Sequence, residues 1–172
     1  YLLTVFLCIS GVLLYAQIKP VKLQCEHLMN PLGIDTPEPR LSWQLKDDRY
    51  GALQQEYRVV VGTDSAVVAA GRGNMWDTQK VASDQMLVCY DGLDLSPFTR
   101  YYWKVDIRDK DQEIRTSDVV AFETGMMHIH NWKGDWISDG HELTGKSIHD
   151  KSAPYFRKEF TAAKKINSAR AY

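Results

Sequence analysis

The sequence predicts an all-β sandwich of about seven strands, followed by the first strands of a second β-sandwich. Two observations lead to this fold class: apolar and polar residues alternate with a period of two from residue 21 onward, and turn-forming residues separate the alternating segments. About seven such segments within about 105 residues fit a two-sheet sandwich. The composition, 44% hydrophobic and 25% charged, indicates a folded globular chain.

The strands are expected at residues 21–27, 41–46, 56–62, 75–80, 85–91, 100–109 and 119–125. The clearest is 100–109, in which Tyr101, Trp103 and every second residue after them face the core while the residues between them face solvent. The only helical candidate is 65–70, with Asp64 or Ser65 as its N-cap and Gly71 at its end.

Residues 95–105 read LSPFTRYYWKV, which has the form L-x-P-x-T-x-Y-x-W-x-V. This pattern resembles the E–F corner and F strand of a fibronectin type III domain, a member of the immunoglobulin-like sandwiches. The resemblance implies that Tyr101 buries its ring while its hydroxyl bonds to the backbone of the corner. We expect Trp43, Tyr101 and Trp103 to be structural core residues.

A second sequence pattern is more specific than a β-sandwich fold requires. Residues 25–43, CEHLMNPLGIDTPEPRLSW, resemble the N-terminal region of bacterial α-L-rhamnosidases of glycoside hydrolase family 78. The likeness continues in order through 74–81, 101–105, 135–137, 154–160, 165–166 and 169–172. The chain departs from the family pattern at Gln79, where glycine is usual, and at Asp111-Gln112, where the family has an Asp-Gly turn.

In that family a fibronectin-like domain precedes a β-sandwich, and a later (α/α)6 barrel hydrolyses terminal α-L-rhamnose with inversion. We expect none of the barrel in this chain, and therefore no catalytic residue. No metal and no cofactor are expected either. The resemblance implies two partners: later domains of the same polypeptide, and a rhamnose-containing glycan bound through the barrel. It divides the chain into a fibronectin-like domain (17–126), a linker (127–154) and the truncated start of a second sandwich (155–172).

Residues 2–16 form an apolar run that is shorter than the roughly 20 residues of a membrane-spanning helix. They fit a signal peptide (1–16) cleaved after Ala16, which predicts export to the periplasm or the extracellular space and no membrane attachment after cleavage. A start without methionine and a strand-like end at Tyr172 predict truncation at both ends. With 21 basic and 22 acidic residues, the chain is not expected to bind nucleic acid.

The acidic residues at 109–113 resemble the start of a calcium loop, but Ile114 and Val120 occupy the positions that need glycine and glutamate. A solvated hairpin is therefore the preferred interpretation. The histidines at 128, 130, 141 and 149 have no recognisable metal spacing. Cys25 and Cys89 can either pair or stay free, and free thiols are favoured because Cys25 faces inward and Cys89 outward.

Trp132 and Trp136 offer two interpretations, a platform on which a sugar stacks or a contact that pins one domain against the next, and the second is preferred. Asp35 and Arg40 are expected to hold the loop before Leu41 by hydrogen bonds, and the prolines of that loop restrict its backbone angles.

Three functions compete. The leading one is the non-catalytic N-terminal portion of an exported α-L-rhamnosidase. The alternatives are a stand-alone extracellular carbohydrate-binding or adhesion module and a receptor-type fibronectin module. Only one or two strands are expected in residues 127–172, at 155–161 and 165–172. They are too few to close a core and therefore favour the first function.

Overall fold

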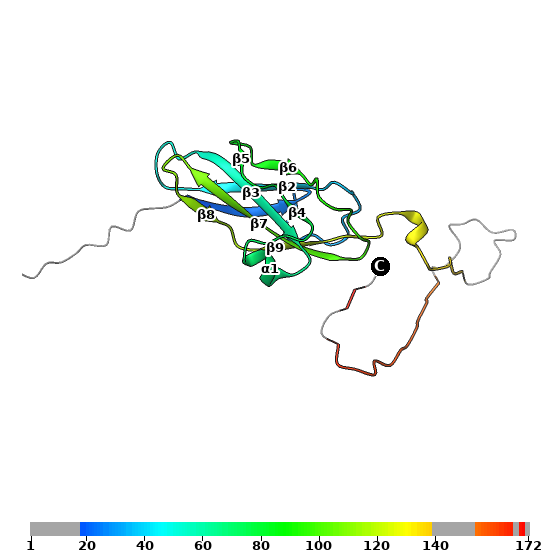
Figure 1. The fold of residues 1–172 in the computed structure, drawn as a ribbon. Coiled ribbons are helices and arrows are strands. Elements are labelled where there is room, and N and C mark those ends of the chain that lie inside the picture. Colours follow the sequence, from blue (N-terminus) through cyan, green and yellow to red (C-terminus); the bar gives the residue numbers. More distant parts are fainter. Residues whose placement is uncertain (1–17, 139–153, 167–168, 171–172) are drawn as a thin grey trace, which may run out of the picture. The chain divides into compact units, whose positions relative to one another are not determined.

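The computed structural model describes residues 18–138, 154–166 and 169–170 (Figure 1). The expected signal peptide, His141 and His149 lie outside the described residues. The chain divides into two units, residues 1–128 and 129–172, which are described separately below.

The first unit is a sandwich of two antiparallel sheets (Figure 1). The smaller sheet has the order β1-β2-β6, with strands β1 (Lys19–Cys25), β2 (Arg40–Lys46) and β6 (Leu87–Cys89). The larger sheet centres on the pair β3 (Gln54–Gly62) and β7 (Arg100–Asp109). Its outer strands are β4 (Trp76–Asp77) and β5 (Val81–Ala82) beside β3, and β8 (Ile114–Thr116) and β9 (Val120–Glu123) beside β7. The expected all-β sandwich is confirmed.

The pairing of β3 with β7 builds the centre of the core. Val59 lies opposite Val105 and Val61 opposite Trp103, and all four side chains are fully buried. The alternation predicted for residues 100–109 is confirmed, with one exception on the outer face. Lys104 is only 6% exposed, because helix α1 (Ser65–Ala69) packs against β7.

Helix α1 begins and ends as its sequence predicts. Asp64 is the N-cap, and its Oδ1 accepts hydrogen bonds from the backbone N–H groups of Ala66 and Val67 at 2.8 and 3.0 Å. After the helix, Gly71 adopts a φ of +75°, a left-handed conformation that glycine adopts without steric cost.

The strand expected at 75–80 is split into β4 and β5, which both pair with β3. Between them Gln79 has a φ of 53°, and Gln112 in the β7–β8 turn has a φ of 64°. These are two of the positions where the rhamnosidase pattern has glycine, and a left-handed backbone explains why glycine suits them.

The strand expected at 119–125 is shorter, and β8 precedes it. β8 pairs with the second half of β7, and β9 pairs with the first half. Ser117 joins them: its hydroxyl oxygen accepts a hydrogen bond from Val105 N–H at 3.0 Å, and its own N–H donates to the Val105 carbonyl at 2.9 Å. The expected hairpin after residue 109 is thus formed by β7 and β8.

Both cysteines of the sandwich are free thiols, as expected. Cys25 on β1 is 1% exposed, whereas Cys89 on β6 is exposed. Strand β2 lies between β1 and β6 and keeps the two apart. Burial, with a smaller effect of the neighbouring Glu26 carboxylate, raises the pKa of the Cys25 thiol to about 12.

The described part of the second unit contains a short 3-10 helix (Ile129–Asn131) and no strand. The strand expected at 155–161 is not formed, and the one expected at 165–172 lies partly outside the described residues. Tyr155 is 103% exposed and Phe160 is 82% exposed. An extended segment without a hydrogen-bonded neighbour does not form a stable strand, which explains the difference.

Candidate functional site

Trp43 connects the two sheets. It is 3% exposed, and its indole N–H donates a hydrogen bond to Gln54 Oε1 at 2.9 Å. The amide nitrogen of Gln54 donates in turn to the carbonyls of Ser83 and Gln85, on the segment that crosses from one sheet to the other. The sequence interpretation missed Gln54, since a buried glutamine on a strand carries no periodic signal.

Tyr101 and Trp103 lie on the inner face of β7. Tyr101 is 1% exposed, its hydroxyl oxygen accepts a hydrogen bond from Ser96 N–H at 2.8 Å, and its ring stacks on Phe122 with centroids 5.4 Å apart. Trp103 is fully buried, and its indole N–H has no hydrogen-bond partner within the described part of the chain.

The loop between β1 and β2 (residues 26–39, the β1–β2 loop) covers the outer edge of β9. Ala121 N–H donates to Asn30 Oδ1, and Glu123 N–H donates to the Pro31 carbonyl, both at 2.9 Å. Ile34 N–H donates to the Glu123 carbonyl at 3.0 Å. The loop therefore pairs the backbone groups that an edge strand would leave free. This explains why residues 30–34 are more specific than a sandwich alone requires.

Asp35 holds the point where the chain leaves the sandwich. Its Oδ1 accepts a hydrogen bond from Met127 N–H at 2.7 Å. The carboxylate also fills the space beside Gly125, where a Cβ atom would lie 2.5 Å from Asp35 Oδ1. The Gly125 carbonyl accepts a hydrogen bond from Phe98 N–H at 2.9 Å. These contacts fix the backbone of 125–127.

Arg40 closes the base of the β1–β2 loop. Its guanidinium forms an ion pair with Glu26 at 2.6 Å, and its backbone N–H donates to the same carboxylate. The hydrogen bonds from Arg40 lower the pKa of Glu26 below its usual value. Asp35 and Arg40 thus form the hydrogen bonds that the sequence analysis expected of them.

The β1–β2 loop also exposes large apolar side chains. Leu28, Met29 and Leu32 are 58%, 67% and 60% exposed. A shallow groove of about 180 Å³ lies beside Met29, between β1 and the β8–β9 connection. Its apolar lining consists of Pro20, Val21, Leu23, Met29 and Val120.

At the other end of the sandwich β2 leads into β3 and β7 turns into β8 (Figure 1). This end carries charged side chains. Arg49 forms ion pairs with Asp47 at 2.7 Å, Asp109 at 3.1 Å and Asp111 at 2.7 Å. Burial alone would raise the pKa of Asp109, but hydrogen bonds from Glu113 N–H and Arg49 lower it. An arginine, rather than a cation site, therefore organises the carboxylates that resemble a calcium loop.

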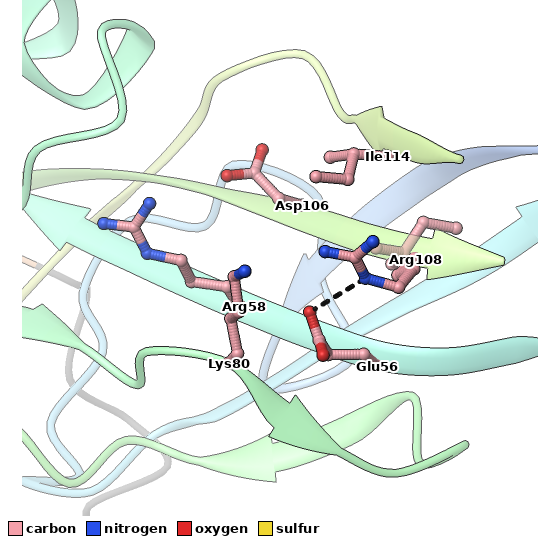
Figure 2. Close-up of a pocket in the computed structure, with 7 residues that line it drawn as sticks. Glu56, Arg58, Lys80, Asp106, Arg108 and Ile114 are labelled. Atoms are coloured by element: carbon pink, nitrogen blue, oxygen red, sulfur yellow. Dashed lines mark hydrogen bonds and ion pairs between the residues drawn. The ribbon is translucent and has the colours of Figure 1, made fainter. Parts of the chain in front are cut away.

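The outer face of the larger sheet carries a shallow charged depression of about 80 Å³, shown in Figure 2. Arg108 pairs with Glu56 within it at 3.4 Å. Arg58 at its border pairs with Asp77 at 2.5 Å, and the hydrogen bond from Arg58 lowers the pKa of Asp77. The charges of this face largely satisfy one another.

Trp132 and Trp136 lie together in the second unit. Their rings stack with centroids 6.5 Å apart and planes at 29°, and Trp136 is 96% exposed. Within residues 18–138 and 154–166, no three His, Cys, Asp or Glu side chains gather in a way that can hold a metal ion. No helix in the described part of the chain is long and apolar enough to cross a membrane.

Comparison with known proteins points to one family. Residues 20–128 match the family model described as the Rha78A-like, N-terminal immunoglobulin domain. An α-L-rhamnosidase of Streptomyces avermitilis is 37% identical over 121 residues, which are 69% of this chain and 12% of that protein. An α-L-rhamnosidase of Formosa agariphila is 28% identical over 162 residues, 83% of this chain and 17% of that protein.

Solved structures agree. An α-L-rhamnosidase of Dictyoglumus thermophilum superimposes with a TM-score of 0.67 at 37% identity, covering 70% of this chain and 14% of that one. The S. avermitilis enzyme, solved in complex with L-rhamnose, also gives 0.67, at 35% identity over 71% of this chain and 12% of that one. The chain spans between 12% and 20% of the length of the curated relatives it matches. The likeness expected from residues 25–43 is confirmed, and the chain belongs to the family of Rha78A-like N-terminal immunoglobulin domains.

Proposed function

We propose that this chain is the non-catalytic N-terminal portion of an exported α-L-rhamnosidase. In the whole enzyme, later domains of the same polypeptide hydrolyse terminal α-L-rhamnose from glycosides or polysaccharides with inversion. The observation that carries the proposal is the match of residues 20–128 to the N-terminal domain of a family whose relatives are named α-L-rhamnosidases.

The chemistry of the sandwich supports a structural role. An inverting glycosidase needs two carboxyl groups about 6.5–9.5 Å apart on either side of the sugar, with room for a water molecule. The carboxylates of Glu26, Asp77 and Asp109 are instead held by Arg40, Arg58 and Arg49. The two depressions, of about 80 and 180 Å³, are smaller than the roughly 300 Å³ at which ligand pockets begin.

Export and domain boundaries are part of the proposal. The apolar residues 2–16 and the small residue Ala16 support a signal peptide cleaved after residue 16. The end of the family match at residue 128 supports a boundary close to 126, followed by a linker to residue 154 and the start of a second sandwich at 155.

The test is hydrolysis of an aryl α-L-rhamnoside. The purified 172-residue chain should release no product above a buffer blank, whereas the polypeptide extended along the reading frame past Tyr172 should be active. Release by the pure chain, or an inactive extended polypeptide, would overturn the proposal.

A second candidate, a stand-alone carbohydrate-binding or adhesion module, is favoured by one observation: the stacked and exposed Trp132 and Trp136. The apolar face of a sugar ring can stack on such flat aromatic faces. Titration of the chain with rhamnose and rhamnose-containing oligosaccharides, followed by tryptophan fluorescence, tests it. Saturable binding that Trp136→Ala abolishes would favour the module, and no saturable change would exclude it.

A further inference from the structure

The apolar part of the β1–β2 loop is an exposed surface that the packing of the sandwich does not account for. Leu28, Met29 and Leu32 lie within five positions of one another and are all more than half exposed. The groove beside Met29 continues this apolar surface to Val21 and Val120. We call Leu28, Met29, Leu32 and this groove the loop face.

The loop face is rigid. Cys25 and Leu28 exchange two backbone hydrogen bonds, of 2.9 and 3.0 Å, at the start of the loop, and Glu26 N–H donates to the Arg40 carbonyl at its base. Asn30 and Ile34 hold its middle to β9. Because the backbone is already ordered, docking on these side chains loses little conformational entropy.

The surroundings of the loop face have the composition of an interface. Ion pairs lie at its border, between Arg40 and Glu26 and between Lys19 and Asp118. An apolar centre with a polar rim is typical of protein interfaces. Addition of a strand to β1 is disfavoured, because Pro20 and the bulge between Val21 and Gln24 interrupt that edge.

The occupant follows from the path of the chain. β9 runs along the β1–β2 loop, and Asp35 fixes Met127 beside it, so all polypeptide after Met127 starts at this end of the sandwich. The chain spans at most 20% of the length of the relatives it matches, so most of a rhamnosidase polypeptide lies outside it. The opposite end is charged, with Arg49 among three carboxylates.

We propose that the loop face is the surface on which a later domain of the same polypeptide, beyond Tyr172, docks. This proposal rests on the proposed function. It assigns Leu28, Met29 and Leu32 to an interdomain contact rather than to the folding of the sandwich.

The experiment compares two variants of the extended polypeptide. The double variant Met29→Asp/Leu32→Asp places charges in the loop face. Leu53→Asp is the matched control, since Leu53 is 61% exposed on the β2–β3 connection at the other end. The double variant should lose rhamnosidase activity on heating at least about tenfold faster than wild type, the factor that corresponds to losing the burial of one apolar side chain. Leu53→Asp should stay within about twofold.

Two further measurements complete the test. Hydrogen exchange of residues 26–35 should be slower in the extended polypeptide than in the 172-residue chain. Both variants of the 172-residue chain should keep the urea midpoint of wild type, because these side chains are exposed. Equal inactivation rates for the double variant and wild type, or equal exchange in both lengths, would overturn the docking proposal.

The outcomes separate the two proposals. If the extended polypeptide is inactive, or if a stop codon follows soon after Tyr172, the proposed function is wrong and so is the docking proposal. If the enzyme is active and Met29→Asp/Leu32→Asp does not speed its inactivation on heating, the docking proposal alone is wrong. Sedimentation of the 172-residue chain tests a third outcome. If the chain forms dimers that the double variant loses and Leu53→Asp keeps, the loop face binds a second copy of the chain and the docking proposal is wrong.

Discussion

The two units contain similar aromatic side chains in opposite environments. In the sandwich, Trp43 is 3% exposed and Trp103 is fully buried, whereas Trp136 and Tyr155 in the second unit are 96% and 103% exposed. The sandwich strands have hydrogen-bonded neighbours on which a second sheet packs, whereas residues 154–166 pair with no strand in the part of the chain that the structure describes. The apolar pattern of the sequence thus predicts which side chains need burial. In the described part of this chain they are buried where strands pair and two sheets pack together.

The largest expected effect is in backbone exchange. Residues 154–166 should exchange at rates close to those of an unfolded chain, while residues 100–109 should open only with the whole sandwich, a difference of several orders of magnitude. Hydrogen exchange of the purified chain, followed by mass spectrometry, measures both segments together. Uniform protection would contradict the comparison and favour the stand-alone module.

The next effect concerns the tryptophans. Trp43→Ala should prevent soluble folding, because truncating a large buried aromatic costs roughly 3–5 kcal/mol, comparable to the stability of a small domain. Trp136→Ala is the control and should leave the urea midpoint of the sandwich unchanged. Soluble, cooperative unfolding of Trp43→Ala near the wild-type midpoint would remove Trp43 from the essential core.

A smaller effect is expected at the corner before β7. Tyr101→Phe removes the acceptor of the Ser96 N–H and should cost about 1–3 kcal/mol, because a partly buried donor is left unpaired. Tyr102→Phe, on the opposite face of the same strand, should cost much less. Urea unfolding of both variants measures the difference, and equal midpoints for Tyr101→Phe and wild type would show that the corner does not depend on this hydroxyl.

Acid should weaken the charged end of the sandwich. The pKa of Asp47, lowered by hydrogen bonds from Arg49, and that of Asp109 both lie below their usual values. A carboxyl group whose pKa is lower in the folded than in the unfolded chain stabilises the fold at pH values above its unfolded pKa, about 3.9. This stabilisation is lost as the pH falls through the pKa of the folded state. Urea midpoints between pH 6 and pH 2.5 should therefore fall more steeply for wild type than for Arg49→Gln. Parallel curves would show that Arg49 does not couple to these acids.

The smallest effect is a gain. Gln79 has a φ of 53°, and Gln79→Gly should stabilise the sandwich by up to about 1 kcal/mol, because a side chain is disfavoured in this conformation. The gain is reduced by the greater freedom of glycine in the unfolded chain. A lower urea midpoint for the variant would show that this freedom, together with the loss of the hydrogen bond from the Gln79 side chain to Asp77, dominates.

The sequence was sufficient for the parts of the fold in which one residue pattern repeats. The alternation in residues 100–109 placed Tyr101 and Trp103 inside, and Asp64 marked the start of α1. It failed where tertiary contacts decide. Lys104 has a solvent-facing position in the alternation, yet α1 covers it. Residues 155–161 have the pattern of a strand but pair with no strand among the described residues.

The loop face shows a similar limit. Residues 25–43 stood out in the sequence through their resemblance to the rhamnosidase N-terminal region. The roles of Asp35 and Arg40 were expected because prolines and charged residues in one loop indicate a fixed backbone. It did not show that Asn30 and Ile34 pair with β9, since no periodicity links a loop to a strand about ninety residues later. The exposure of Leu28, Met29 and Leu32 follows from this pairing and became visible only in the structure.

The two free thiols allow the opening of the sandwich to be timed without an added probe. In the chain from residue 17 onward, an alkylating reagent at pH 8 should modify exposed Cys89 at once. Cys25, buried and with a pKa of about 12, becomes reactive only when β1 detaches, since an exposed thiol has a pKa near 8.5. The mass of a singly labelled chain therefore identifies molecules in which β1 has stayed paired since the reagent was added. The rate at which the doubly labelled mass grows gives the rate at which β1 detaches under native conditions when labelling outpaces reclosing.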